Sequence, residues 1–191
     1  MSLKKKSVIR DWVESIIVAF ILAMIIRTFV VQAFKIPTGS MRMTLIEGDL
    51  ILVNKFIYGA KIPFTRLRLP AMRQPKRGDV IVFIYPEDKK KDFIKRLVGL
   101  PGETVEIKGG SIYINGKSIQ ESIFNQIYYY NRGDLGLEGQ KILIPKDCYF
   151  VLGDNSASSK DSRFWGFVPK DNLLGKALII YWPLNRIRLL K

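Results

Sequence analysis

The sequence has no histidine, a single cysteine, and only 17 acidic residues against 31 lysines and arginines, which gives a formal net charge of +14. Without histidine the chain cannot form a Ser-His-Asp or Cys-His catalytic site, an HExxH zinc site or an imidazole switch near neutral pH. Cys148 alone cannot close an internal disulfide bond or build a thiolate metal site. An enzyme made from this chain must take its acid-base group from Asp, Glu, Lys or Tyr, and we expect no cofactor and no metal.

The apolar residues, 48% of the 191, are concentrated in one long run near the N-terminus. Residues 12–34 contain only two charges, Glu14 and Arg27, and exceed the roughly 20 residues that a transmembrane helix needs. Arg27 lies nearer one end, where a long side chain can reach the membrane interface. The run follows four basic residues, Lys4, Lys5, Lys6 and Arg10. By the positive-inside rule, this charge predicts a cytoplasmic N-terminus.

These features predict a single-pass protein of the cell membrane in three parts. They are a basic cytoplasmic segment (1–11), a transmembrane anchor (12–34) and an extracytoplasmic body (35–191) with a small insertion at about 104–145. One alternative is a cleaved secretory signal, for which Val31-Gln32-Ala33 offers small residues in suitable places. Another is a buried helix of a soluble protein. The length of the run and its few polar positions favour the uncleaved anchor.

The body is a series of short β segments separated by glycine and proline, a pattern typical of a mainly β fold. Gly109-Gly110 between two such segments predicts a hairpin. Residues 59–76 predict a basic and apolar loop, either an ordinary surface loop or one that lies against the bilayer. The expected strands are residues 49–53, 79–84, 104–107, 111–114, 148–152 and 177–182.

The positive charge indicates a particular kind of partner. The basic residues are dispersed through the body, and the aromatic residues do not alternate with them as they do on a platform that stacks nucleic-acid bases. We therefore expect no nucleic-acid partner. Anionic lipid is the expected neighbour of an anchored basic protein.

The first segment that can carry chemistry is Pro37-Thr38-Gly39-Ser40-Met41, directly beyond the anchor. Gly39 permits a backbone conformation that presents Ser40 and its N–H outward. Serine is a weak nucleophile and needs a base. Taken alone, Thr-Gly-Ser is also typical of a simple turn.

Lys95 is a candidate for that base because it falls within an apolar, strand-like run. Alternation along a strand places Lys95 and Arg96 on opposite faces, so we expect one of them to face the core. Burial lowers the pKa of lysine, and a fall of about 3 units from ~10.4 makes it neutral near pH 7. A neutral lysine can act as a general base. The alternative is an edge-strand lysine whose charge reaches solvent.

A third segment, from Gly153 to Arg163, is dense in hydroxyl and acidic residues and follows an apolar strand, which by itself fits a polar turn. Together the segments resemble the type I signal peptidases, membrane-bound Ser/Lys endopeptidases, in order and over nearly the whole chain. The matching motifs are Pro37-Thr38-Gly39-Ser40-Met41, Lys76-Arg77-Gly78-Asp79 with the following strand, Lys95-Arg96-Leu97-Val98-Gly99-Leu100-Pro101-Gly102-Glu103, and Gly153-Asp154-Asn155 with Ser159-x-Asp161-Ser162-Arg163.

The resemblance implies a coiled antiparallel β-sheet and assigns roles by position. Ser40 matches the nucleophile and Lys95 the general base, while Thr38 and the Ser40 N–H match the oxyanion hole. Ser159 matches the hydroxyl that orients the lysine. The supporting scaffold is matched by Asp154, Asp161 and Arg163, and the pockets for small side chains by Ile36, Leu45, Phe93 and Ile94.

The resemblance further implies a monomer that cuts preproteins after small residues, usually Ala-X-Ala, at −3 and −1. One departure is Met43, where the family commonly has proline, so a fixed φ is lost. Two other activities remain open. One is a Ser/Lys peptidase dedicated to pilus or conjugation substrates. The other is a catalytically silent, membrane-anchored β scaffold. The anchor and the four motifs argue against a self-cleaving repressor.

Overall fold

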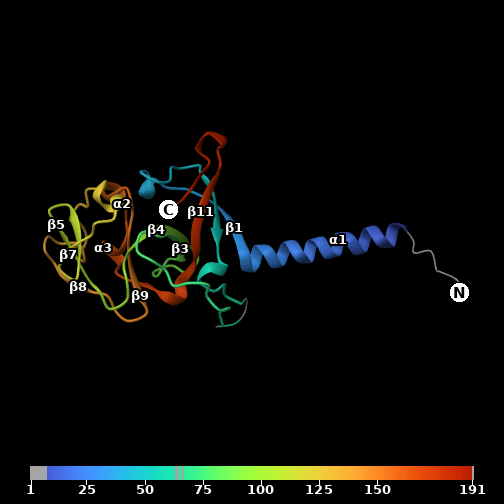
Figure 1. The fold of residues 1–191 in the computed structure, drawn as a ribbon, viewed down its shortest axis with the longest axis horizontal. Helices are drawn as coiled ribbons and strands as arrows, with labels where there is room; N and C mark the ends of the chain where they lie inside the picture. Colours follow the sequence, from blue (N-terminus) through green and yellow to red (C-terminus); the bar gives the residue numbers. More distant parts are fainter. Residues whose placement is uncertain (1–7, 63–64, 66, 191) are drawn as a thin grey trace.

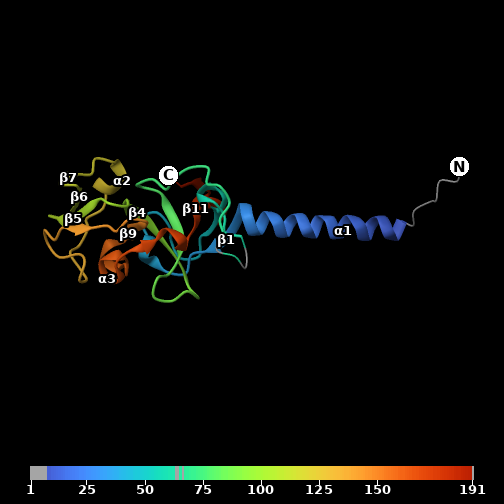
Figure 2. The same ribbon diagram turned by 90° about the horizontal axis from the view of Figure 1, so that it is seen from below.

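The computed structural model describes residues 8–62, 65 and 67–190. A long helix projects from one side of a β-rich body, as Figures 1 and 2 show from two directions. The predicted mainly β body with one apolar N-terminal helix is confirmed. The basic residues Lys4 to Lys6 lie outside the described residues, as do residues 63, 64 and 66 of the predicted loop.

The N-terminal helix passes directly into the sheet of the body. Helix α1 (Val8–Ile25) continues as a π-helix, η1 (Ile26–Val30), which strand β1 (Val31–Lys35) follows at once. The stretch Ile9–Val30 is long and apolar enough to cross a membrane, and none of it is buried. The predicted helical run to Phe34 was wrong for its last four residues, because these pair with strand β2. An apolar run alone does not distinguish helix from strand.

An antiparallel sheet of eight strands forms the main part of the body. Its order is β1-β2-β11-β3-β4-β9-β10, with β12 paired to β11. The remaining strands of this sheet are β2 (Leu50–Asn54), β3 (Val80–Ile84), β4 (Asp92–Gly99), β9 (Cys148–Leu152), β10 (Val168–Pro169), β11 (Leu173–Trp182) and β12 (Arg188–Leu189). The short helices are η2 (Gly39–Met41), η3 (Phe56–Tyr58), α2 (Ser122–Asn125), η4 (Ser156–Ser158), α3 (Ser162–Trp165), η5 (Lys170–Asn172) and η6 (Leu184–Arg186).

A second, four-stranded sheet occupies the segment for which we expected a small insertion. Its order is β7-β6-β5-β8, and it lies at the end of the body away from α1 (Figure 1). Its strands are β5 (Thr104–Lys108), β6 (Ser111–Ile114), β7 (Lys117–Ser118) and β8 (Ile142–Leu143). Gly109 and Gly110, both with positive φ, turn the chain between β5 and β6 as predicted. This sheet packs its apolar face against Phe150 and Leu152 of β9.

The central strands β4 and β9 are covered on both faces. Leu97 of β4 belongs to one apolar cluster, while Val98 belongs to the cluster shared with the second sheet. Lys95 and Arg96 are therefore both buried, with 4% and 1% of their surfaces exposed. Alternation predicted that one of them faces the core, but both are buried, because Arg96 contacts Thr44 and Asp154 while Lys95 contacts Ser40. Strand β4 also pairs on both sides, so Lys95 is not on an edge strand.

Gly175 of β11 lies against Asn54 and Val53 of strand β2, with no room for a side chain, and this gives a prediction about stability. A Cβ atom at Gly175 would lie 2.3 Å from the Asn54 carbonyl oxygen and 2.9 Å from Val53 Cγ1. Because both contacts are closer than atoms can approach, Gly175→Ala should lower the free energy of unfolding by about 3 kcal/mol, measured by urea denaturation.

Gly109→Ala is the matched control. Nothing lies within 4 Å of its Cβ position and only its positive φ resists alanine, so its expected cost is about 1 kcal/mol. Equal losses in the two variants would contradict the proposed clash at Gly175.

Candidate active site

Ser40 lies in a tight turn that follows β1. Thr38 has extended backbone angles (φ −136°, ψ 155°), and the chain then enters the one-turn helix η2. Met41 points into the core and is fully buried, and its carbonyl accepts the backbone N–H groups of Thr44 and Leu45. The anchored methionine leaves Ser40 half-buried at the surface of the sheet.

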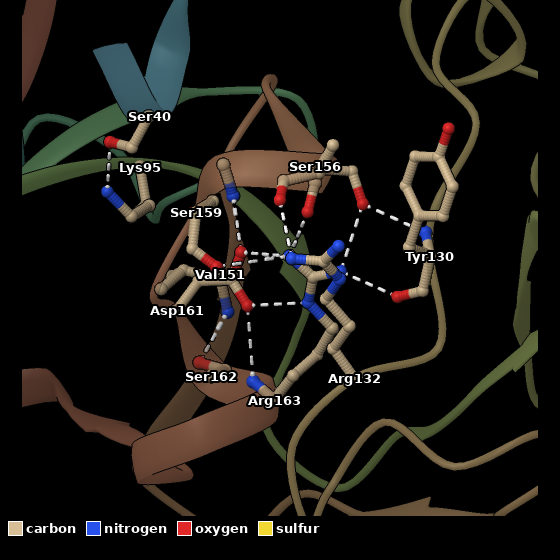
Figure 3. Close-up of polar contacts among 12 residues, drawn as sticks. Ser40, Lys95, Tyr130, Arg132, Val151, Ser156, Ser159, Asp161, Ser162 and Arg163 are labelled. Atoms are coloured by element: carbon tan, nitrogen blue, oxygen red, sulfur yellow. Dashed lines mark hydrogen bonds and ion pairs between the residues drawn. The ribbon is translucent and has the colours of Figure 1, made fainter.

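Lys95 reaches Ser40 from the middle of β4. Its Nζ lies 2.6 Å from Ser40 Oγ and 3.0 Å from the carbonyl oxygen of Ile94 (Figure 3). The two residues are 55 positions apart in sequence, so only the folded sheet brings them together. A serine hydroxyl within hydrogen-bonding distance of a lysine amine is the geometry that proton transfer between them requires.

Burial makes Lys95 a weaker base than a lysine in water. Removal from solvent disfavours the charged amine and lowers its pKa from 10.5 to about 8. The charges of Asp161 and Asp154 oppose this shift, but neither carboxylate is hydrogen-bonded to the amine. With a pKa near 8, about one lysine in ten is neutral at pH 7.

Asp154 is bound to an arginine and not to the lysine. Arg96, the neighbour of Lys95 on β4, donates from Nε and Nη2 to the two carboxylate oxygens of Asp154 over 2.8 and 2.6 Å. Thr44 Oγ1 lies 2.5 Å from the same carboxylate. Arg96 and Asp154 are each about 1% exposed, so this ion pair is removed from solvent, and its carboxylate accepts an additional hydrogen bond from Thr44. The pair also joins the Ser40 turn, through Thr44, to the end of β9.

Asp161 is held in the same way by Arg163, and both are fully buried (Figure 3). Arg163 donates from Nε and Nη2 to the two oxygens of Asp161, each over 2.8 Å. Its other donors reach the carbonyl of Tyr130 and both the hydroxyl and the carbonyl of Ser156. All five guanidinium N–H groups are therefore satisfied. Asp161 in turn accepts the backbone N–H of Gly153 over 3.0 Å.

Ser159 lies beside the turn that carries Ser40, without the expected contact to Lys95. Its side chain is buried, and its Oγ has no hydrogen-bond partner among the described residues. A Cβ atom at Gly153 would lie 2.1 Å from Ser159 Oγ and 2.5 Å from the carbonyl of Ser40, so glycine lets the two serines approach. The Lys95 amine makes two hydrogen bonds to the described residues, which leaves capacity for a third that would satisfy Ser159.

Four apolar residues were predicted to line substrate pockets. Ile36 and Leu45 are buried in one apolar cluster, against which Ile94 packs. Phe93 belongs to a different cluster, where its ring stacks on Tyr85 with centroids 4.3 Å apart. The structure therefore brings three of the four together. Thr38 is exposed two residues before Ser40.

Asn155 is a residue of the site that the sequence did not single out. Its backbone N–H donates to the Ser40 carbonyl over 3.0 Å, and its side-chain amide donates to the Gly39 carbonyl over 2.9 Å. Asn155 thus clamps the turn from the opposite loop. The available signal was its place in the Gly153-Asp154-Asn155 motif. An uncharged side chain in a polar segment does not reveal, however, that it contacts the backbone of a residue more than 100 positions away.

Met43, the departure from the family pattern, lies exposed in a loop that other contacts close. Arg42 and Glu47 form an ion pair across this loop, with Nη2 of the arginine 2.6 Å from the carboxylate. Both side chains are partly in solvent, so the pair contributes little to the stability of the fold. It nevertheless connects the two ends of the segment in which the fixed φ of proline is missing.

A family model described as signal peptidase, peptidase S26, matches residues 9–182. The chain belongs to the signal peptidase family. Signal peptidase I of Leptolyngbya laminosa is 38% identical, and the match covers 96% of this chain and 85% of the relative. Signal peptidase I P of Bacillus subtilis subsp. natto is 37% identical, with 97% and 95% covered. A crystal structure of signal peptidase I from Enterococcus faecalis V583 is 35% identical; the match covers 55% of this chain and 97% of that one, with a TM-score of 0.46.

Family membership fixes the class of reaction. The chain is a serine peptidase, a hydrolase of the group that removes signal peptides. In this signal peptidase the hydroxyl of Ser40, the amine of Lys95 and the clamp at Asn155 meet at one edge of the turn.

The clamp gives a prediction. Asn155→Asp keeps the shape of the side chain but replaces its donor with an acceptor that faces the Gly39 carbonyl, so the turn should loosen and kcat should fall about tenfold or more. The measurement is steady-state cleavage of a signal-peptide substrate, with kcat and KM determined separately.

Lys160→Gln is a suitable control, because this residue lies in the same loop but its side chain is exposed to solvent. A normal kcat in Asn155→Asp, with the fold intact by circular dichroism, would show that the clamp does not position Ser40.

Proposed function

We propose that this protein is a membrane-anchored signal peptidase that cuts exported preproteins with a Ser40/Lys95 dyad. The observation that carries the proposal is the 2.6 Å separation of Ser40 Oγ from the Nζ of a lysine that is 4% exposed. Family membership supports the reaction, and the lowered pKa of Lys95 supports its use as a base.

The reaction begins when neutral Lys95 takes the proton of Ser40 as its oxygen attacks the scissile carbonyl. The resulting oxyanion faces the Ser40 N–H and the Thr38 hydroxyl. Ser40 stands in the first turn of η2, where a backbone N–H has no intrahelical partner, so this donor is available. Lys95 returns the proton to the leaving amine, and the acyl-enzyme forms on Ser40.

Deacylation uses the same groups in the same order. Lys95, neutral again, removes a proton from a water molecule, which attacks the acyl carbon, and Ser40 recovers its proton as the acid is released. Ser159 supports this cycle in our proposal. Its buried hydroxyl has no hydrogen-bond partner among the residues that the structure describes, so it can hold the amine when Ser40 is acylated. Asp154, Asp161 and Arg163 hold the loop behind these residues.

Substrate choice rests on apolar surfaces near the dyad. Ile36, Leu45 and Ile94 pack together next to the turn, and Phe93 lies one strand residue away, so the walls of the pockets are apolar and well packed. Such walls favour small side chains at −3 and −1, as in Ala-X-Ala, because larger ones require the core to move. We propose that the enzyme works as a monomer.

Helix α1 is the membrane anchor in this proposal. Its apolar surface is exposed throughout and its length suits a bilayer. The basic residues of segment 1–11 place the N-terminus in the cytoplasm, and the domain of residues 35–191 then lies on the outer side of the cell membrane, where exported preproteins emerge.

The dyad is tested by two substitutions. Ser40→Ala and Lys95→Ala should each lower kcat for a preprotein with an Ala-X-Ala site by at least about a thousandfold, because the nucleophile or its base is lost. Cleavage is measured by mass spectrometry of the products, with a pilin-type substrate in parallel.

Two exposed neighbours, Ser158 and Lys160, supply controls of the same residue types. Ser158→Ala and Lys160→Ala should retain activity. Cleavage by Lys95→Ala at the normal rate would contradict the proposed dyad. Cleavage of the pilin-type substrate alone would contradict the proposed substrate class.

The pH dependence follows from the base. Because only neutral Lys95 accepts the proton, kcat/KM should rise with pH and reach half its maximum near the pKa of about 8. A rate profile from pH 6 to 10 measures this, and a midpoint below pH 6 would contradict the assignment.

Stability supplies an independent check on the same pKa. The folded pKa of Lys95 is about 8 and its usual value 10.5, so between these values the unfolded chain binds more protons and the fold gains stability as pH rises. Lys95→Met should lose this rise in urea denaturation, whereas Lys160→Met should keep it.

A further inference from the structure

The basic loop of residues 59–76 has no part in the proposed catalysis, yet it encloses a cavity. The cavity has a volume of about 230 Å³ and is lined by Tyr58, Arg68, Tyr149 and Lys170, among others. It lies between this loop and the start of β11, away from Ser40. Two of its lining residues, Arg68 and Lys170, are cationic, and the nearest carboxylate to Arg68 is the exposed one of Asp171, 3.9 Å away.

Arg68 is the first of these charges. Among the described residues its guanidinium donates to backbone carbonyls alone: those of Gly59, Asp171 and Leu173 over 2.8 to 2.9 Å, and that of Lys170 over 3.5 Å. The Asp171 carboxylate lies 3.9 Å from Nε, beyond hydrogen-bonding distance, and is 88% exposed. Nε itself is buried and has no hydrogen-bond partner in the part of the chain that the structure describes. Arg68 is thus half-buried and positively charged, and its Nε–H lacks an acceptor. An anion in the cavity would supply that acceptor.

Lys170 is the second charge. It lines the same cavity from η5 and forms no ion pair with any described residue. The pKa of Lys61, on the same loop, is lowered by burial and by the nearby positive charge of Arg68. Arg73 also lines the cavity, but Asp79 binds it with two hydrogen bonds and neutralises it.

The loop lies on the side of the body from which α1 leaves. The backbone N–H of Lys55 donates to the carbonyl of Val30, the last residue of η1, over 2.9 Å, and η3 and the loop follow Lys55 directly. In both ribbon views, the teal segment after β2 lies beside the inner end of the helix (Figures 1 and 2). Leu67 and Met72 of the loop are 66% and 69% exposed, although both are apolar.

We propose that this cavity binds the phosphate group of an anionic phospholipid, with Arg68 and Lys170 as its cationic ligands. The proposal rests on the membrane anchor of the proposed function. Exposed Leu67 and Met72 beside a cationic cavity fit an interface where phosphate and acyl chain are adjacent. A zwitterionic headgroup fits less well, because its own cation would be repelled by Arg68 and Lys170.

The test uses the full chain in a neutral detergent. Its affinity is measured for three probes: short-chain phosphatidylglycerol, short-chain phosphatidylcholine and inorganic phosphate. We expect the first to bind tightest and Lys170→Gln to weaken it about tenfold, since one charge-assisted contact is lost. Lys170 is exposed and accepts this change without loss of fold, whereas Arg68 holds three carbonyls. Lys117→Gln, on strand β7 far from the cavity, is the control and should bind normally.

Two outcomes would overturn the proposal. Equal affinity in Lys170→Gln and Lys117→Gln would remove the cavity as the site. Inorganic phosphate that binds as tightly as phosphatidylglycerol and displaces it would assign the cavity to a free anion. The anchor is tested separately by sedimentation with phosphatidylcholine vesicles, and the dyad by cleavage of a soluble peptide, so failure of either is distinguishable from failure at the cavity.

Discussion

The site depends on two buried arginines that neutralise the acids around Lys95. Asp154 and Asp161 both raise the pKa of the lysine, and an ion pair with either would keep its amine charged. Arg96 and Arg163 bind these carboxylates instead, through paired hydrogen bonds of 2.6 to 2.8 Å. Breaking a buried pair typically costs about 3 to 5 kcal/mol, so the acids are held firmly where they are. The lysine is left with a hydroxyl and a carbonyl as partners, both of which tolerate a neutral amine.

Contacts from distant parts of the chain also hold the short turn that carries Ser40. Ser40 is contacted by residues from the far end of the chain: Asn155 bonds its carbonyl, and Thr44, four residues on, bonds Asp154. The C-terminal hairpin adds a further contact from Arg188 to the carbonyl of Thr44. A local sequence of glycine and serine would adopt many conformations in isolation. Here the conformational entropy is removed by contacts that only the complete sheet can supply.

The parts of the fold that depend on local sequence, such as strands bounded by glycine and proline, were predictable. The residues of the candidate site were predictable where their types and motifs are distinctive. Glycine and proline bounded the expected strands, and β9 (Cys148–Leu152) matches its expected range. The end of the helix was missed because the apolar run continues unchanged into β1, and both structures accept such residues. Burial of both Lys95 and Arg96 depends on contacts with Ser40, Thr44 and Asp154, which are distant in sequence and which alternation along one strand does not predict. The contacts of Asn155 are equally non-local.

The direct passage from helix to sheet restricts where the proposed enzyme can cut. Ser40 is ten residues beyond Val30, a span of at most about 35 Å, and five of these residues are fixed by pairing of β1 with β2. In the proposed topology, the nucleophile therefore stays at one height above the membrane. A substrate whose apolar segment shares that membrane presents its scissile bond at a height set by its own sequence. Two features then determine the cleavage site in a substrate. Apolar pockets accept small side chains, and the anchor fixes the height above the membrane at which the pockets lie.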